Sequence, residues 1–187
     1  MATLADLTNW IHVWGEVRGI VANSTPFAQV CKTHEELLEL VEAHALIQAR
    51  LDAHEDRKDA IGDVYVTLVM VCACNKTPVT GMEYLLHSAN ENPNSVKALC
   101  EHFPQLLRAC ALCDGIESSQ TVQFEAVKMI GLLRDVCWNY RLDFTACVEH
   151  AYEIISKRKG TLRPDGGSAK EQTWSVWTAA LAHATQR

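Results

Sequence analysis

The stretch KDAIGDVYVTLVMVCAC, residues 58–74, decides the fold. It begins with charged residues and becomes almost entirely apolar after Asp63. A helix that is apolar around its whole circumference must be buried on several sides. We therefore expect a buried helix from about Glu55 to Cys74, with neighbouring helices covering it.

The remainder of the chain has the same helical character. Apolar residues recur three and four positions apart almost throughout, and strand-like alternation is nearly absent, which predicts an all-α bundle. The expected helices cover about residues 5–20, 26–53, 55–74, 82–89, 95–113, 120–140, 144–158 and 170–184. Pro26 suits a first helical turn, whereas Pro104 is expected to break or restart its helix. A loop is expected at residues 114–119, where serines can cap the next helix. The apolar stripe expected on the helix 26–53 consists of Leu37, Leu38, Val41, Ala45, Ile47 and Leu51.

Length, charge and cysteine usage bound the class of protein. A chain of 187 residues is expected to form a single domain. The net charge of −6 argues against general affinity for nucleic acid or acidic membranes, and the longest apolar run is too short to span a bilayer. No signal peptide is expected at the start of the chain, and the eight cysteines lie in apolar helical patterns, which favours buried thiols over disulfides or a zinc site. We expect a soluble cytoplasmic protein.

Two clusters of carboxylates lie about one helical hairpin apart. They comprise Glu35, Glu36, Glu39 and Glu42, followed by Asp56, Asp59 and Asp63. At about 100° per residue, Glu36 and Glu39 share one helix face, and the three aspartates fall within an arc of about 60° on the next helix. Two such faces turned toward each other form a cage of oxygens that requires a hard divalent cation. The sequence therefore predicts a magnesium site between two helices.

The position of Asp63 distinguishes this pattern from an ordinary solvated helix face. A carboxylate at the start of a buried helix is costly unless it has a partner. Gly62 precedes it, and a glycine weakens a helix by about 1 kcal/mol relative to alanine. Gly62 therefore indicates the close approach of another helix or of a ligand.

Three motifs resemble those of a known family. They are residues 29–40, QVCKTHEELLEL, residues 58–64, KDAIGDV, and Ala151-Tyr152 followed by Arg158-Lys159-Gly160. Together they resemble the MazG-like, all-α nucleoside triphosphate pyrophosphohydrolases, in particular the phage-type members, over roughly residues 10–75 and 142–172. The resemblance implies a Mg²⁺-dependent enzyme that splits a nucleoside triphosphate into the monophosphate and pyrophosphate. It also implies a MazG-like core of about residues 5–75 and 142–172, a helical insertion of about residues 76–139, and a homodimer or homotetramer.

The resemblance implies a set of metal ligands by position. Three of them are Glu36, Glu39 and Asp63. At a fourth position the general family has glutamate where this chain has Ala60, whereas the phage-type pattern has an acid at the position of Asp59. We therefore expect Asp59 to be the fourth ligand, with Asp56 as the alternative. Mg²⁺ is the expected cofactor, and Mn²⁺ is the expected substitute.

The remaining site residues would act on water and substrate. Either Glu35 or Glu36 would orient or deprotonate the attacking water, and the sequence leaves the choice open. The residues expected to contact substrate are Lys32, Arg158, Lys159 and Trp14, with Arg158 or Lys159 for the phosphates and Trp14 for the base. Trp10 and Trp14 lie four residues apart on one helix face, where they would either stack a base or belong to the core.

Two departures from the phage-type pattern leave alternatives open. Glu153 and Ser156 stand where relatives have asparagine and lysine that can contact the nucleotide. One alternative is therefore a non-catalytic helical protein with a degenerate site that binds another protein. Another is a specialised dUTP or dCTP pyrophosphatase. The preferred base and sugar, and the choice between pool sanitation and nucleotide supply during phage growth, are not determined by these motifs.

Overall fold

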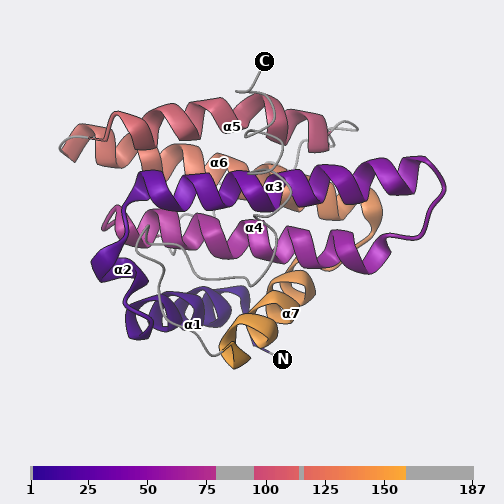
Figure 1. Ribbon diagram of the computed structural model, residues 1–187, viewed down its shortest axis with the longest axis horizontal. Coiled ribbons are helices and arrows are strands. Elements are labelled where there is room, and N and C mark those ends of the chain that lie inside the picture. The colour runs from indigo at the N-terminus through magenta and orange to yellow at the C-terminus, as the bar shows by residue number, and fades with distance from the viewer. Residues whose placement is uncertain (1, 79–94, 114–115, 159–187) are drawn as a thin grey trace, which may run out of the picture.

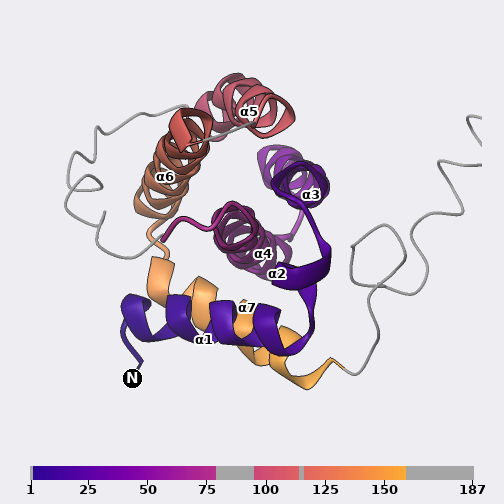
Figure 2. The same cartoon turned by 90° about the vertical axis from the view of Figure 1, so that its left-hand side faces the viewer.

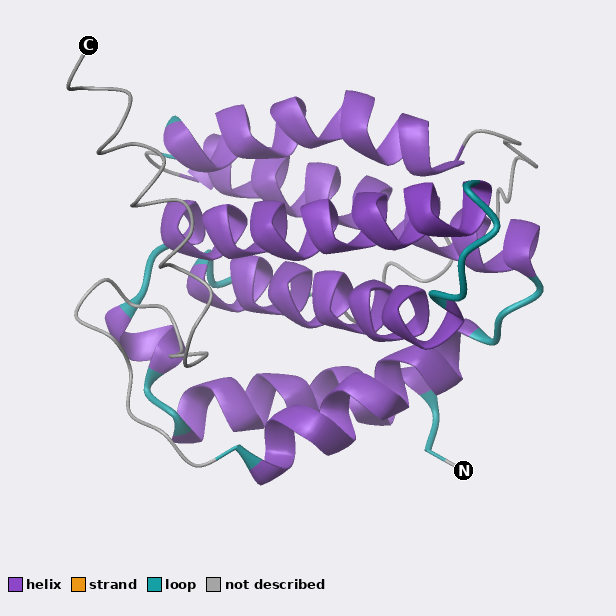
Figure 3. Cartoon of the chain, turned by 45° about the vertical axis from the view of Figure 1, so that its right-hand side comes forward, coloured by secondary structure: helices purple, strands orange, loops and turns teal. Residues whose placement is uncertain are grey.

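The computed structural model describes residues 2–78, 95–113 and 116–158. These residues contain seven helices and no strand (Figures 1 and 3), so the all-α prediction is confirmed. The helices are α1 (Leu4–Val17), α2 (Ile20–Asn23), α3 (Pro26–Gln48), α4 (His54–Cys74), α5 (Ser95–Ala111), α6 (Ile116–Tyr140) and α7 (Phe144–Lys157).

The helix α4 lies at the centre of the bundle, as the end-on view in Figure 2 shows. It makes its most extensive contact with α3 and also contacts α1, α2, α6 and α7. In Figure 1 the pair α3 and α4 lies between α1 and α7 on one side and α5 and α6 on the other. Every residue from Ala60 to Ala73 is buried, which confirms the expected burial on several sides.

Local side-chain chemistry explains where several helices begin. Thr3 and Asp6 form a reciprocal capping box at the start of α1, in which each side chain accepts a hydrogen bond from the backbone N–H of the other. Thr25 caps α3, and Pro26 occupies its first turn as expected. Asp143 caps α7. These caps satisfy backbone N–H groups that a helix terminus leaves without partners.

The ends of α1 and α3 come earlier than the apolar pattern predicts. α1 stops at Val17 because Gly19 adopts a left-handed conformation with φ of 71°, and the short helix α2 occupies part of the expected loop. α3 stops at Gln48 because Arg50 also has a positive φ, of 63°. Apolar periodicity continues past both ends, so it could not locate them.

Two expectations about the later helices are wrong. α5 continues through Pro104, and the proline and Cys100, whose carbonyl loses its helical hydrogen bond, are both exposed residues. α6 begins at Ile116, so residues 116–119 do not form a loop. Ser119 lies inside the helix and donates a hydrogen bond of 3.1 Å to the Asn75 carbonyl. The helices expected at 82–89 and 170–184 lie outside the described residues.

The pair α5 and α6 shares one hydrophobic core with the other helices. A continuous cluster of buried apolar side chains extends from α1 to α7 and includes residues of both. α5 packs on α6 and α3, where His34 stacks on Phe103 with 5.1 Å between ring centroids. The expected insertion therefore contributes directly to the burial of the central helices.

Gly62 lies where α4 and α7 cross. A Cβ atom at this position would be 2.4 Å from the Cys147 carbonyl oxygen and 2.6 Å from the Ala151 Cβ. Both distances are too short for a side chain, so only glycine permits this approach. The expectation of close contact at Gly62 is confirmed, and the neighbour is a helix.

A polar cluster joins α3, α4 and α6 near the start of α4. Arg57 is buried, and its guanidinium carbon lies 3.7 Å from the centroid of the Tyr140 ring. The Tyr140 hydroxyl is 2.7 Å from His44 Nδ1. Burial lowers the pKa of His44, and the nearby charge of Arg57 lowers this pKa further. The cluster therefore favours a neutral His44.

The cysteines divide into buried and exposed thiols. The buried thiols are those of Cys72, Cys110, Cys137 and Cys147, as expected, whereas Cys31 and Cys100 are exposed. Burial raises the pKa of the Cys72 thiol to about 12, so this thiol is protonated at neutral pH. Across residues 2–78, 95–113 and 116–158, no helix combines the length and the apolar character needed to cross a membrane.

Candidate functional site

Two buried carboxylates meet between α3 and α4. Glu36 lies on α3 and Asp63 on α4, and they are 4% and 5% exposed. Both line one small cavity with a volume of about 40 Å³. Its other polar lining residues are Gln29, Lys32, Thr67 and Arg158, and its walls are completed by Trp14, Ile20, Val66, Met70 and Ile155. Five helices, or the residues directly after them, therefore enclose one site.

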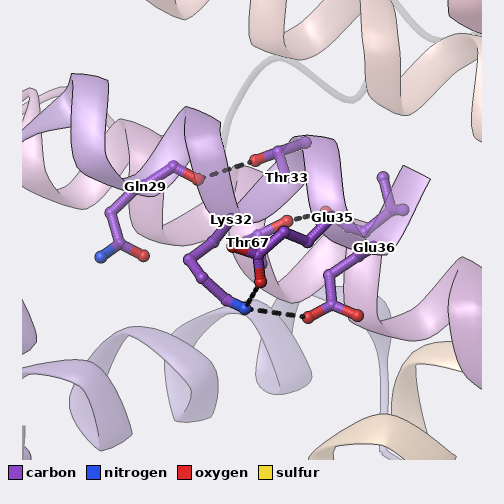
Figure 4. A network of polar contacts seen from close by, with 7 residues as sticks. Gln29, Lys32, Thr33, Glu35, Glu36 and Thr67 are labelled. Atoms are coloured by element: carbon purple, nitrogen blue, oxygen red, sulfur yellow. Dashed lines mark hydrogen bonds and ion pairs between the residues drawn. The ribbon is translucent and has the colours of Figure 1, made fainter. Parts of the chain in front are cut away.

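Lys32 connects the glutamates of α3. Its Nζ lies 3.8 Å from Glu36 Oε1 and also contacts the Glu35 carboxylate (Figure 4). The side chain of Lys32 is 22% exposed, that of Glu35 is 40% exposed, and that of Glu36 is 5% exposed. Lys32 therefore spans the distance from the buried carboxylate to the solvent side of the site. The ammonium group offsets part of the cost of burying Glu36.

Two threonines near the site bond to their own helices. The Thr33 hydroxyl donates to the Gln29 carbonyl at 3.1 Å, and the Thr67 hydroxyl donates to the Val64 carbonyl at 2.9 Å (Figure 4). A hydroxyl that donates its hydrogen still has lone pairs that can accept or coordinate. Thr67 lines the cavity and can present such an oxygen there.

The other expected metal ligands point elsewhere. Glu39 is exposed, because Leu37 and Leu40 occupy the buried face of α3 at this level. Asp59 lies toward α7, where its Oδ1 is 3.8 Å from His150 Nε2, and Asp56 is exposed. In the described part of the chain, no group of three or more histidine, cysteine, aspartate or glutamate side chains is arranged to hold a metal. The structure thus brings together Glu36 and Asp63 but not the expected cage of four carboxylates.

Three of the four residues expected to contact substrate line the same cavity. Lys32, Trp14 and Arg158 all line the cavity, although they come from three different parts of the chain. Arg158 directly follows the end of α7. Lys159 lies outside the described residues. Because these three lining residues are partly exposed while the carboxylates are buried, the opening of the cavity lies on their side.

Trp14 and Trp10 have separate environments. The Trp14 indole donates a hydrogen bond of 3.1 Å to the Ile155 carbonyl of α7, so its N–H is used by the fold. Trp10 is 42% exposed and lies against Tyr152, with 5.6 Å between ring centroids. The interpretation of both as core residues is therefore wrong for Trp10. Trp14 forms a wall of the cavity.

The three residues that differ from the family pattern, Ala60, Glu153 and Ser156, all lie outside the cavity lining. Ala60 is buried and does not line the cavity, so the chain has a core residue at this position. Glu153 and Ser156 are exposed on α7, and the Ser156 hydroxyl donates to the Glu153 carbonyl at 3.1 Å. Neither of them lines the cavity.

Two residues of the site were missed by the motif analysis. Gln29 lies two helical turns before Glu36, and Thr67 lies one turn after Asp63. Both positions follow from helical spacing, since residues at i+4 and i+7 share a face with the carboxylate. A polar residue at such spacing within the apolar run 64–74 was the available signal for Thr67.

The donor set fits Mg²⁺. Glu36 and Asp63 offer carboxylate oxygens, and Gln29 and Thr67 are uncharged oxygen donors. Mg²⁺ prefers such oxygens and is commonly held by one or two carboxylates, with water and substrate phosphates completing its shell. A volume of about 40 Å³ has room for a few water molecules. It is far below the roughly 300 Å³ of a small-molecule pocket, so a nucleotide would have to lie at the opening.

A larger groove lies between α1 and the end of α4. Its volume is about 350 Å³, and its charged lining residues are His12, Glu16 and Lys76. His12 and Glu16 lie 3.7 Å apart on the exposed surface of α1. Charged side chains in such positions are well solvated and contribute little, so the buried pair Glu36 and Asp63 marks the more informative site.

Comparisons with protein-family models, with curated proteins and with solved structures found no match. The all-helical class therefore rests on the structure itself, and the candidate site rests on its own geometry and on the motifs.

Proposed function

We propose that the protein is a Mg²⁺-dependent nucleoside triphosphate pyrophosphohydrolase of the MazG-like type. The observation that carries this proposal is the burial of Glu36 and Asp63, from two helices, against one cavity that Lys32 and Arg158 also line. Burying two carboxylates is costly, and clusters of this kind concentrate at functional sites. The resemblance of the three motifs supports the same reaction class.

Glu36 and Asp63 would hold the metal ion. When bound, Mg²⁺ neutralises phosphate oxygens and lowers the pKa of a coordinated water. Glu39 and Asp59 point away from Glu36 and Asp63, so we assign the primary role to the buried pair. This assignment needs only the two carboxylates, since water and phosphate can supply the remaining oxygens.

The other residues of the site would act on substrate and water. Lys32 and Arg158, at the opening, would bind the phosphates, and Trp14 would form one wall. Glu35, which is more exposed than Glu36 and lies beside Lys32, would accept the proton of the attacking water. The water oxygen forms a bond to the α-phosphorus, the bond from that phosphorus to the α,β-bridging oxygen breaks, and pyrophosphate leaves.

We further propose that the protein is a homodimer or homotetramer. Trp10, Val13 and Val17 on α1 are 42%, 45% and 82% exposed, and their spacing places them on one face of the helix. An exposed apolar stripe of this kind is typical of a surface that pairs. Light scattering after gel filtration would measure the mass, and a strictly monomeric protein would contradict this proposal.

The decisive experiment is a pyrophosphate-release assay with all ribo- and deoxyribonucleoside triphosphates, with and without Mg²⁺. We expect metal-dependent release from the intact protein and loss of at least about a hundredfold in Asp63→Ala and Glu36→Gln. Glu55→Gln is the matched control, because Glu55 is an exposed acid in the first turn of the same helix as Asp63. Circular dichroism would verify that each variant remains helical.

Three outcomes separate the alternatives. Release from no nucleotide would contradict the enzymatic function and favour a non-catalytic binding protein. Release that is confined to dUTP or dCTP would identify a specialised pyrophosphatase. Equal turnover in Asp63→Ala would show that the reaction occurs elsewhere on the molecule.

A further inference from the structure

We propose that Lys32 is an internal counter-ion that occupies the cation position of Glu36 and must leave it when a divalent ion binds. Lys32 would then pass to the phosphates of the substrate. This inference rests on the proposed function, because it concerns the metal affinity of the same site. It predicts that Lys32 weakens metal binding while the nucleotide is absent.

The geometry of Lys32 differs from that of a surface lysine. Lys32 and Glu36 are four residues apart on α3, with 3.8 Å between Nζ and Oε1. Lys97 and Glu101 have the same spacing on α5, with 3.5 Å between charged atoms. The exposed fractions are 71% and 66% for the side chains of Lys97 and Glu101, but 22% and 5% for those of Lys32 and Glu36. The Lys32 ammonium group is therefore partly buried and lies between the buried Glu36 and the more exposed Glu35.

The cations at the cavity offset much of its negative charge without a metal. The carboxylates of Glu36 and Asp63 in the lining, and that of Glu35 beside Lys32, are faced by the positive charges of Lys32 and Arg158. A divalent ion held by the same carboxylates adds two positive charges, and the ammonium group repels it at short range. A triphosphate brings the compensating negative charge, so the lysine can exchange its carboxylate partner for a phosphate.

The space in the site also favours this exchange. The volume of about 40 Å³ is what remains with Lys32 in place beside Glu36, and movement of the ammonium group outward would enlarge it for an ion that keeps several of its waters. The partial exposure of Lys32 shows that its side chain already reaches the opening. Its flexible four-carbon stem lets the ammonium group turn outward without movement of the helix.

The test is Mn²⁺ binding to the full chain without nucleotide, at one fixed pH, measured by electron paramagnetic resonance of free Mn²⁺. Lys32→Met should bind Mn²⁺ at least about tenfold more tightly than the unmodified protein. Lys32→Arg keeps the charge and should remain within about threefold of the unmodified protein. Lys97→Met removes the matched surface lysine and should remain within about twofold.

A second measurement tests the counter-ion role directly. Without metal, Lys32→Met should unfold at a lower temperature, because the buried carboxylate has lost a cation. Saturating Mn²⁺ should then raise its unfolding temperature by more than it raises that of the unmodified protein. Lys32→Gln should show the same two changes in unfolding temperature. It replaces Lys32→Met in the test if the methionine variant does not fold.

The outcomes distinguish this inference from the proposed function. Unchanged or weaker Mn²⁺ binding in folded Lys32→Met and Lys32→Gln, with binding lost in Asp63→Asn, would overturn the counter-ion role and leave the metal site in place. Absence of binding in every variant, or binding that Asp63→Asn leaves unchanged, would overturn both. Binding that is detectable only after Lys32 is replaced would support the inference most directly.

Discussion

The pair α3 and α4 and the pair α5 and α6 bury different kinds of residues. The buried face of α3 alternates apolar side chains with Gln29, Thr33 and Glu36, whereas that of α5 is apolar except for Ser95 at its start. Buried polar groups cost stability unless they are paired. The difference indicates that α5 mainly provides packing, while α3 gives up part of its stability to hold a polar site.

The two pairs also hold buried charge differently. In α5 and α6, His102 Nε2 and Glu125 Oε2 lie 2.7 Å apart, with the side chains 18% and 15% exposed. In this pair a single imidazole lies beside a single carboxylate. Around the cavity of α3 and α4, two carboxylates on different helices are brought together, and the cations lie toward the opening. The first arrangement joins two helices, and the second places two carboxylates at the lining of one cavity.

The largest expected effect is the loss of packing in α5. Leu106 is fully buried, so Leu106→Ala should lower the free energy of unfolding by about 2–5 kcal/mol. Thr33→Val is the matched variant on α3 and should change the free energy of unfolding by less than about 1 kcal/mol, because the Thr33 hydroxyl donates to the Gln29 carbonyl of its own helix. Urea denaturation followed by circular dichroism measures both. Equal losses would remove the contrast between the two pairs.

Gly62→Ala tests the close approach that positions α7 against α4. The new methyl group would meet the Cys147 carbonyl at 2.4 Å, so we expect a loss of about 1–3 kcal/mol despite the better helix propensity of alanine. Gly15→Ala is the matched control, since the atoms within 3 Å of its Cβ belong to the flexible end of Met70. Gly15→Ala should lower the free energy of unfolding by less than Gly62→Ala does. A larger loss at Gly15 would show that the backbone contact at Gly62 adapts easily.

Glu125→Gln tests the matched pair between α5 and α6. Replacing the carboxylate removes the acidic group that lies 2.7 Å from His102 Nε2, and we expect a loss of about 1–2 kcal/mol in the free energy of unfolding. Glu101→Gln, in the exposed pair with Lys97, should change it by less than about 0.5 kcal/mol. If both variants behave alike in thermal unfolding, burial of the His102 pair contributes nothing.

The smallest expected effect is a pH dependence where α3 meets α6. Because the pKa of His44 in the folded protein lies below its ordinary value of 6.5, the unfolded chain binds more protons once the pH falls below 6.5. Stability should therefore be complete above pH 6.5 and decrease as the pH falls toward the lowered pKa of the folded state. His44→Gln should flatten this part of the profile. An unchanged slope between these limits would assign the dependence to other groups.

The apolar stripe of α3 illustrates what periodicity misses. Of the residues expected there, Leu37 is buried, but Leu38 and Leu51 are 51% and 56% exposed. A stripe defined by apolar character excludes the polar residues that the fold buries. Glu36 lies on the buried face of α3, where it lines the same cavity as Asp63 of α4.

The same limit applies to the metal ligands. Helical spacing placed Glu39 near the face of Glu36 and Asp59 near that of Asp63, but both positions are turned away from the cavity. Spacing describes angles around one helix axis. The rotation of α4 against α3 and α7 decided which of two neighbouring carboxylates faces the site.

By itself, the sequence determined the helical class, the place of Pro26 in a first helical turn, the buried central helix and the close approach at Gly62. Each of these follows from local chemistry or from the periodicity of a single helix. Only the tertiary structure decided that Glu36 and Asp63 meet, that Lys32 and Arg158 join them, and that the enclosed volume is about 40 Å³. The crossing and rotation of helices depend on side chains that are distant in the chain, and no single segment encodes them.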